Sequence, residues 1–89
     1  MGHLSWGELE RRQAQAATVL PLGKKIEHYK TRDIYQIIGH CIIEKSDEVG
    51  ILYSAVGHSE VTFMRPWLEF FELVELDGAQ VERFRIVED

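Results

Sequence analysis

The 89-residue sequence lacks several features that define common protein classes. Its 1 cysteine, Cys41, excludes an internal disulfide, which fits a reducing compartment. No apolar run approaches the roughly 18 residues of a membrane span. Charged residues near the N-terminus interrupt any signal-peptide core. We therefore expect a cytoplasmic protein that does not enter a membrane.

Basic residues are fewer than acidic ones: the sequence has 10 Lys and Arg and 15 Asp and Glu, which gives a net charge of −5. Nucleic-acid-binding proteins usually present a basic surface, so this balance disfavours nucleic acid as a partner. The charge is distributed unevenly, since the charged residues in 24–32 are mainly basic and those in 66–89 are mainly acidic. This pattern indicates either two solvated faces of opposite sign or a local basic patch for an anionic ligand.

Motifs for metal binding and catalysis are also missing. His28, His40, Cys41 and His58 lack paired ligand spacing, and the neighbours His40 and Cys41 should point to opposite faces of a strand. Cys41 is in phase with Ile37 and Ile43, which indicates a packed small hydrophobe rather than a nucleophile. The sequence therefore predicts no enzyme, no cofactor and no metal.

An N-terminal helix is expected over residues 5–18. Ser5 and Glu8 have the spacing of a capping box, in which hydroxyl and carboxylate each accept from a backbone N–H. A helix with so thin an apolar face must pack on the body or on a second copy. That face comprises Trp6, Leu9 and Ala16 or Ala17.

The chain changes character after a connector that contains Pro21 and Gly23. We expect residues 1–23 to form the helix with its connector and residues 24–89 to form a small β-barrel domain. The longest strand should cover residues 33–45, where Gly39 predicts a bend or bulge. Its core face is expected to be the apolar one, Tyr35, Ile37, Gly39, Cys41 and Ile43.

The segment VTFMRPWLEFFELV, residues 61–74, is expected to form a corner between strands. We expect a strand to Arg65, a helical turn opened by Pro66 and a return into a second strand. Asp77–Gly78 is a strong hairpin signal, and residues 81–87 should close the sheet with Phe84 and Ile86 facing inward. Five or six short strands with turns between them predict a mainly β chain, curled into a small barrel with an N-terminal helix.

Several short motifs follow one another in this order: His28–Tyr29–Lys30, Tyr35, Ile38–Gly39, Ile51–Leu52–Tyr53, Arg65–Pro66, Phe70, Glu72, Val74, Gly78, Val81 and Arg83–Phe84. Together they resemble the small bacterial proteins of the domain-of-unknown-function 1653 family, over residues 26–86. Where that family usually has Trp-Val before Arg-Pro, this chain has Phe63–Met64. The resemblance implies an SH3-like barrel and implies no activity.

A basic and aromatic cluster is the feature that points most directly to function. If the barrel brings the ends of two strands together, it offers a guanidinium, an imidazole and flat rings to a carboxylate, a phosphate or an extended peptide. The alternative is a structural role, with the arginine paired and the rings packed. The candidate binding residues are His28, Tyr29, Lys30, Tyr53, Arg65 and Trp67.

Three functions remain open at this point. The first is a non-catalytic binding module for a protein segment or a small anionic ligand. The second is a structural protein that forms a homo-oligomer through the helix and the strand face of Ile34, Ile38 and Ile42. The third is a single-stranded nucleic-acid binder that stacks bases on aromatic rings, against which the net charge counts.

Overall fold

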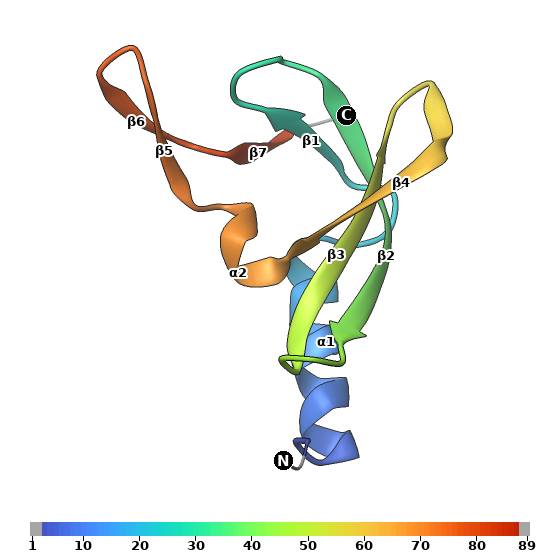
Figure 1. Cartoon of the computed structure of the whole chain (residues 1–89). Coiled ribbons are helices and arrows are strands. Elements are labelled where there is room, and N and C mark those ends of the chain that lie inside the picture. The colour runs from blue at the N-terminus through green and yellow to red at the C-terminus, as the bar shows by residue number, and fades with distance from the viewer. Residues whose placement is uncertain (1–2, 88–89) are drawn as a thin grey trace.

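A computed structural model describes residues 3–87, which are mainly β with an N-terminal helix (Figure 1). The mainly β class and the helix are therefore confirmed. The elements in chain order are α1 (Trp6–Val19), β1 (Lys25–His28), β2 (Ile34–Ile43), β3 (Glu48–Ala55), β4 (His58–Pro66), α2 (Trp67–Phe70), β5 (Leu73–Leu76), β6 (Ala79–Glu82) and β7 (Phe84–Val87).

The start of α1 is capped as its sequence predicts. Ser5 Oγ accepts a hydrogen bond from the Glu8 N–H at 3.1 Å. The Glu8 carboxylate does not complete the capping box but pairs with Arg11 and Arg12 at 2.6 and 2.9 Å. These two guanidinium groups lower the pKa of Glu8 to about 2. The cap therefore fixes where the helix begins.

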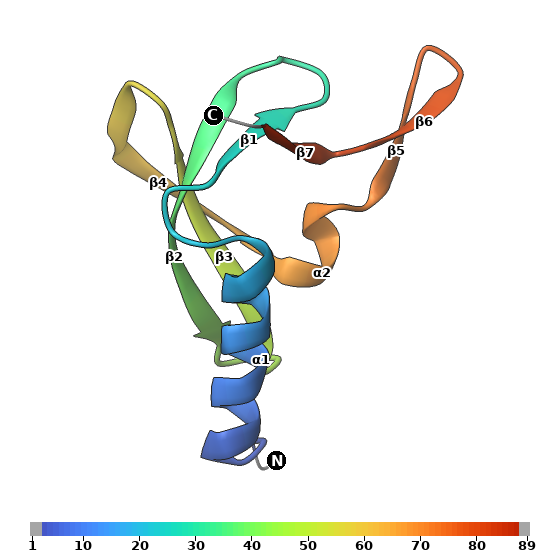
Figure 2. The ribbon, with the colours of Figure 1, turned by 180° about the vertical axis from the view of Figure 1, so that it is seen from behind.

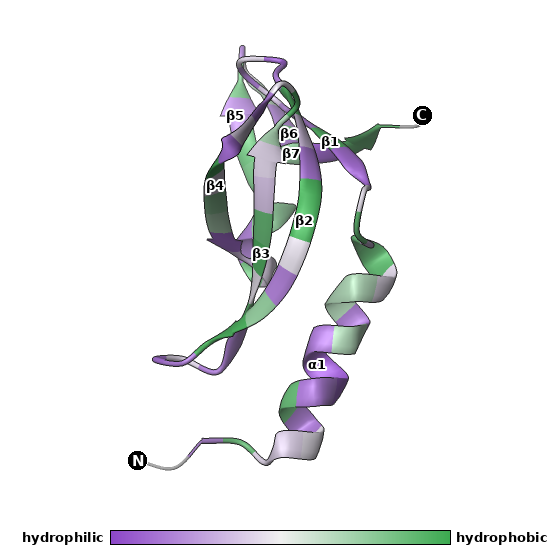
Figure 3. Ribbon diagram, turned by 90° about the vertical axis from the view of Figure 1, so that its right-hand side faces the viewer, coloured by the Kyte–Doolittle hydropathy of each residue, from purple (hydrophilic) through white to green (hydrophobic). Residues whose placement is uncertain are grey.

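The helix packs as a layer beside the sheet, mainly on β2 and β3 (Figure 3). Ala16 and Leu20 are fully buried there, and Leu9 is buried nearer the start. The prediction that Trp6 belongs to this buried face is wrong, because its side chain is 82% exposed. The first turn of α1 extends past the β2–β3 turn, so no strand covers that position (Figures 1 and 2).

The main sheet has five antiparallel strands in the order β4-β3-β2-β1-β7, and β5 and β6 form a separate hairpin. Its outer strands, β4 and β7, are not paired with each other, so the sheet is not closed into a barrel. The prediction of an SH3-like barrel is therefore not confirmed. The local reason is the Asp77–Gly78 turn, which pairs β5 with β6 instead of extending the sheet.

A bulge in β2 changes which side chains face the core. The register with β3 shifts between Ile37 and Gly39, as the mid-strand glycine predicts. The extra residue reverses the alternation beyond it, so His40 lies opposite the buried Ile51. Cys41 consequently lies opposite Gly50, whose missing Cβ would stand 2.8 Å from Cys41 Sγ. The single core face predicted for residues 35–43 is therefore wrong beyond Gly39.

The Arg-Pro corner is built as expected. Pro66 ends β4 and caps α2, and Phe70 from this short helix is fully buried. The Phe70 ring stacks on Phe84 of β7, with ring centroids 4.6 Å apart. One core cluster unites α1, α2 and the sheet, and it contains Ala16, Leu20, Ile26, Ile37, Val49, Ile51, Tyr53, Phe70 and Phe84. The division of the chain at residue 23 stays a prediction.

The expected closing strand, residues 81–87, is interrupted at Arg83. Its first half forms β6 in the hairpin with β5, and its second half forms β7 beside β1. Phe84 is buried as predicted, but Ile86 is exposed because β7 is an edge strand. We call the β5–β6 hairpin, residues 73–82, the arm. It projects from the corner beyond α2 (Figures 1 and 2).

Candidate functional site

His28 ends β1 in a half-buried position. Its Nδ1 accepts from the N–H groups of Lys30 and Thr31 at 3.2 and 3.4 Å, so the neutral imidazole carries its proton on Nε2. Burial, followed by the positive charges of Arg83 and Arg65, lowers the pKa of His28. The imidazole therefore favours the neutral form and offers an Nε2–H donor.

Arg65 and Arg83 approach this imidazole from two elements far apart in the sequence. Their side chains are 29% and 22% exposed. Arg65 Nη1 lies 3.5 Å from Glu69 Oε1, and an Arg83 Nη2 hydrogen donates to Glu72 Oε1. Among the described residues, the buried Nε–H of each arginine has no acceptor. The two glutamates thus leave part of each guanidinium without a partner.

Aromatic rings complete this region. Tyr35 contacts Phe63 and Phe84 edge to face, with ring centroids 6.1 and 6.0 Å apart, and Phe84 contacts His28 at 5.2 Å. Phe63 is 44% exposed, so one ring remains open to solvent. Burial raises the pKa of Tyr35, which keeps its hydroxyl protonated. We call the set His28, Tyr35, Phe63, Arg65 and Arg83 the aromatic–arginine cluster.

The sequence-predicted candidates do not all reach this cluster. Tyr29 contacts the His28 ring at 4.8 Å and also lines a groove facing the arm. Lys30 is exposed, and its contact with His28 uses its backbone. Tyr53 is 5% exposed, so it forms the floor of the region rather than its surface. Trp67 contacts Phe71 and lines a groove against α1 instead.

Sequence reasoning singled out His28 and Arg65 but missed Arg83 as a site residue. Strict alternation placed Arg83 on an uninterrupted strand. The available signal was the pair Glu82–Arg83, two successive polar residues that break the period of two in residues 81–87. That break coincides with the passage from β6 to β7, where Arg83 is drawn back to the body.

Residues 3–87 contain neither a candidate membrane-spanning helix nor a candidate metal-binding group. No helix in this range combines the length and apolar character needed to cross a bilayer. No group of three or more His, Cys, Asp or Glu side chains in this range is arranged to hold a metal ion.

A model of the family described as "Protein of unknown function (DUF1653)" matches residues 24–86. The chain belongs to this family. The match confirms the resemblance seen over residues 26–86, and it contains every residue of the aromatic–arginine cluster but not α1. No curated protein and no solved structure matches the chain. DUF1653 membership therefore assigns no activity, and function has to be argued from the site.

The chemistry available to this DUF1653 chain at the cluster is donation of hydrogen bonds next to flat rings. Two guanidinium groups and a neutral imidazole supply N–H donors. These donors outnumber the two glutamates, each of which pairs with one of the arginines. Such a set is suited to a ligand that brings an oxyanion and a ring.

Proposed function

We propose that this protein is a non-catalytic binding module whose aromatic–arginine cluster takes a small anionic ligand with a carboxylate or a phosphate group. The observation that carries the proposal is that Arg65 and Arg83 each keep a buried Nε–H without an acceptor among the described residues. Their charges, after burial, also lower the pKa of the His28 imidazole. Two cationic groups that both depress a third basic group make a region of positive potential. An anion bound there accepts hydrogen bonds from guanidinium N–H groups.

Geometry favours a ligand that carries a ring beside its negative charge. Phe63 and Arg65 lie two residues apart on β4, so their side chains share one face of the strand. Phe63 lies beside the Tyr35 ring, with ring centroids 6.1 Å apart. A flat ligand could stack on the exposed Phe63 face while its oxyanion accepts from the arginines.

Titration with phenyl phosphate tests the proposal. Inorganic phosphate, which lacks the ring, and phenol, which lacks the anionic group, serve as comparison probes. We expect the Nε–H signals of Arg65 and Arg83 to shift in NMR spectra, and phenyl phosphate to bind more tightly than either fragment. Arg65→Ala should weaken binding at least about tenfold, because a charged hydrogen bond contributes about 1.5–3 kcal/mol.

Arg11→Ala is the matched control, since Arg11 lies on α1 and is 63% exposed. This variant removes the same charge and should leave the affinity for phenyl phosphate unchanged. Equal affinity in Arg65→Ala and the unsubstituted protein, with both folded, would refute the proposal. Equal binding of phenol would also refute it, because phenol carries no anion.

Self-association is a second candidate that a specific observation favours. The outer face of the sheet, opposite the core, carries Ile38, Cys41 and Met64, and Met64 is 47% exposed. This face differs from the predicted one, because the bulge turns Ile42 toward the core while Ile38 stays exposed. Light scattering should then show a dimer that Met64→Glu converts to a monomer. A monomer without any substitution removes this candidate.

A further inference from the structure

A concave site lies at the start of α1, on the opposite end of the molecule from the arm (Figure 1). It is a groove of about 670 Å³, within the range of about 300–1,000 Å³ typical of small-molecule sites. We call it the α1 groove. Its apolar surface comes from Leu4, Trp6, Leu9 and Ile42, and carboxylates border it at Glu10 and Glu44.

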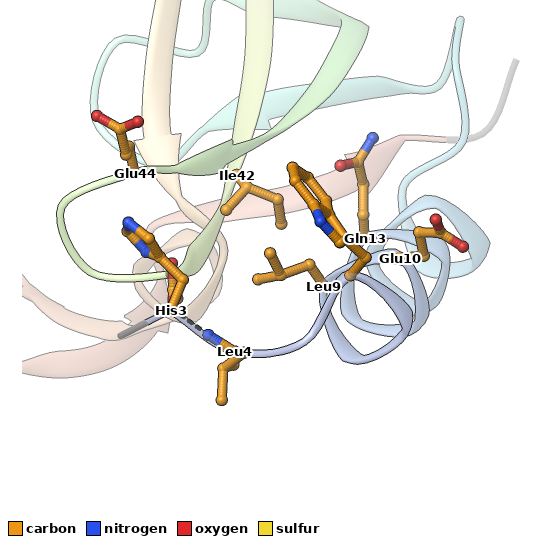
Figure 4. A pocket seen from close by; sticks show the side chains of 9 residues that line it. His3, Leu4, Leu9, Glu10, Gln13, Ile42 and Glu44 are labelled. Atoms are coloured by element: carbon orange, nitrogen blue, oxygen red, sulfur yellow. Dashed lines mark hydrogen bonds and ion pairs between the residues drawn. The ribbon is translucent and has the colours of Figure 1, made fainter. Parts of the chain in front are cut away.

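The α1 groove is bounded on one side by residues 3–5, which return toward the β2–β3 turn. Asp47 in that turn holds them, because its Oδ1 lies 2.7 Å from His3 Nδ1 and its Oδ2 accepts the Leu4 N–H at 2.9 Å. These two contacts lower the pKa of Asp47. In Figure 4, Leu9 and Ile42 lie between the strand and the helix, with Glu44 on one side and Glu10 on the other.

Trp6 is the unusual component of this groove. Its indole is 82% exposed, although tryptophan is normally well buried in a folded domain. An exposed indole face attracts organic cations through its ring quadrupole. The helix and the strand thus place an aromatic face, an apolar floor and two carboxylates around one concave surface.

Two carboxylates of the α1 groove carry charge that no side chain of residues 3–87 neutralises by an ion pair. Neither the Glu10 nor the Glu44 carboxylate has a cationic partner among the described residues, and the nearby Arg12 is already paired with Glu8. Asp47 is occupied by His3 and Leu4. A bound cation therefore meets two carboxylates whose charge is available.

From this arrangement we infer that the α1 groove binds a small organic cation, an amine on an apolar ring, independently of the aromatic–arginine cluster. The apolar body of such a ligand rests on Leu9 and Ile42 and against Trp6. Its ammonium group reaches the rim between Glu10 and Glu44. The two proposed sites thus take ligands of opposite charge.

Trp6 itself reports on occupancy. The sequence has 2 tryptophans, so Trp67→Phe leaves Trp6 as the sole indole of the full-length protein. We expect 2-phenylethylamine to shift its fluorescence to the blue in a saturable manner, with a Kd below about 1 mM. The neutral 2-phenylethanol and the anionic 3-phenylpropionate should bind at least about tenfold more weakly, because the rim carboxylates contribute only to the cation.

The charge variants complete the test. Glu10→Gln with Glu44→Gln should weaken amine binding about three- to tenfold, as expected for two exposed ion pairs. Glu75→Gln with Asp77→Asn changes the charge equally on the remote arm and should have no effect. The indole N–H signal of Trp6 in NMR spectra of the unsubstituted protein gives the same readout if Trp67→Phe folds poorly. Absence of any shift, equal binding of the three probes, or unchanged affinity in the Glu10 and Glu44 variant overturns the inference.

Discussion

The body of this protein and its arm differ in how their strands are stabilised. The body consists of α1, α2 and the five-stranded sheet, and it encloses one core cluster. In the arm, by contrast, none of residues 73–82 is buried, and Leu73 is 60% exposed. The body is held by burial of apolar surface, whereas the arm depends on its turn and its own hydrogen bonds.

This difference shows what a strong turn can and cannot do. Asp77 and Gly78 both adopt positive φ, at 51° and 83°, which is the geometry of a tight two-residue hairpin turn. A hairpin of two strands alone is marginal in water, so the arm needs an attachment. Arg83 provides it, because its carbonyl oxygen accepts the Tyr29 N–H of the body at 3.0 Å. Its own N–H donates to Glu72 O at 2.9 Å and its guanidinium pairs with Glu72, which joins the two flanks of the arm. The base of the arm therefore lies at the aromatic–arginine cluster.

The largest effect should come from α2, where two residues of a single helical turn face opposite environments. Phe70→Ala removes a fully buried ring and should lower the free energy of unfolding by about 3–5 kcal/mol. Leu68→Ala is the matched control, because Leu68 is 73% exposed, and it should change stability by less than about 0.5 kcal/mol. Urea denaturation followed by circular dichroism measures both. Similar losses in the two variants would mean that α2 does not anchor the body.

Local chemistry made much of this fold predictable. Ser5 starts the helix, Pro66 turns the corner and Asp77–Gly78 makes the hairpin. Each acts locally, because the Ser5 hydroxyl caps the first turn, the proline ring fixes φ, and Gly78 tolerates a positive φ. The two arginines at the cluster were less accessible to sequence reasoning. Arg65 stands out beside Pro66, but Arg83 acquires its position only from the break between β6 and β7.

Long-range features were the ones that sequence reasoning missed. The bulge at Ile38 was signalled by Gly39, but its consequence for Cys41 depends on which register β3 selects. Sheet closure depends on whether β5 pairs with a distant strand or with β6, and the local turn decides in favour of β6. Trp6 shows the same limit. Helical periodicity predicts on which face of α1 its side chain lies, but it does not predict whether a strand extends far enough to cover that side chain.

The second prediction sharpens the comparison by loosening the arm alone. Gly78→Ala places a side chain at φ 83°, which should cost about 1 kcal/mol. Hydrogen exchange of arm amides should then accelerate about fivefold, while the urea midpoint of the body stays the same. Gly7→Ala is the control, because a Cβ at Gly7 meets nothing within 4 Å, and it should stabilise α1 slightly. A fall in the global midpoint for Gly78→Ala would show that arm and body unfold together.

The smallest expected effect concerns His28, where the arm meets the body. Its pKa is lowered in the folded protein from the ordinary value of 6.5, so the unfolded chain binds its proton first as the pH falls. The stability that the neutral imidazole contributes is therefore present above pH 6.5 and declines as the pH drops below that value. Urea midpoints should fall as the pH is lowered below 6.5, and His28→Gln should make this decline less steep.

Arg83→Gln removes one repelling charge, so an NMR titration should give a higher pKa for His28 in this variant. An unchanged His28 pKa would mean that the arm's attachment does not contribute to the positive potential of the cluster.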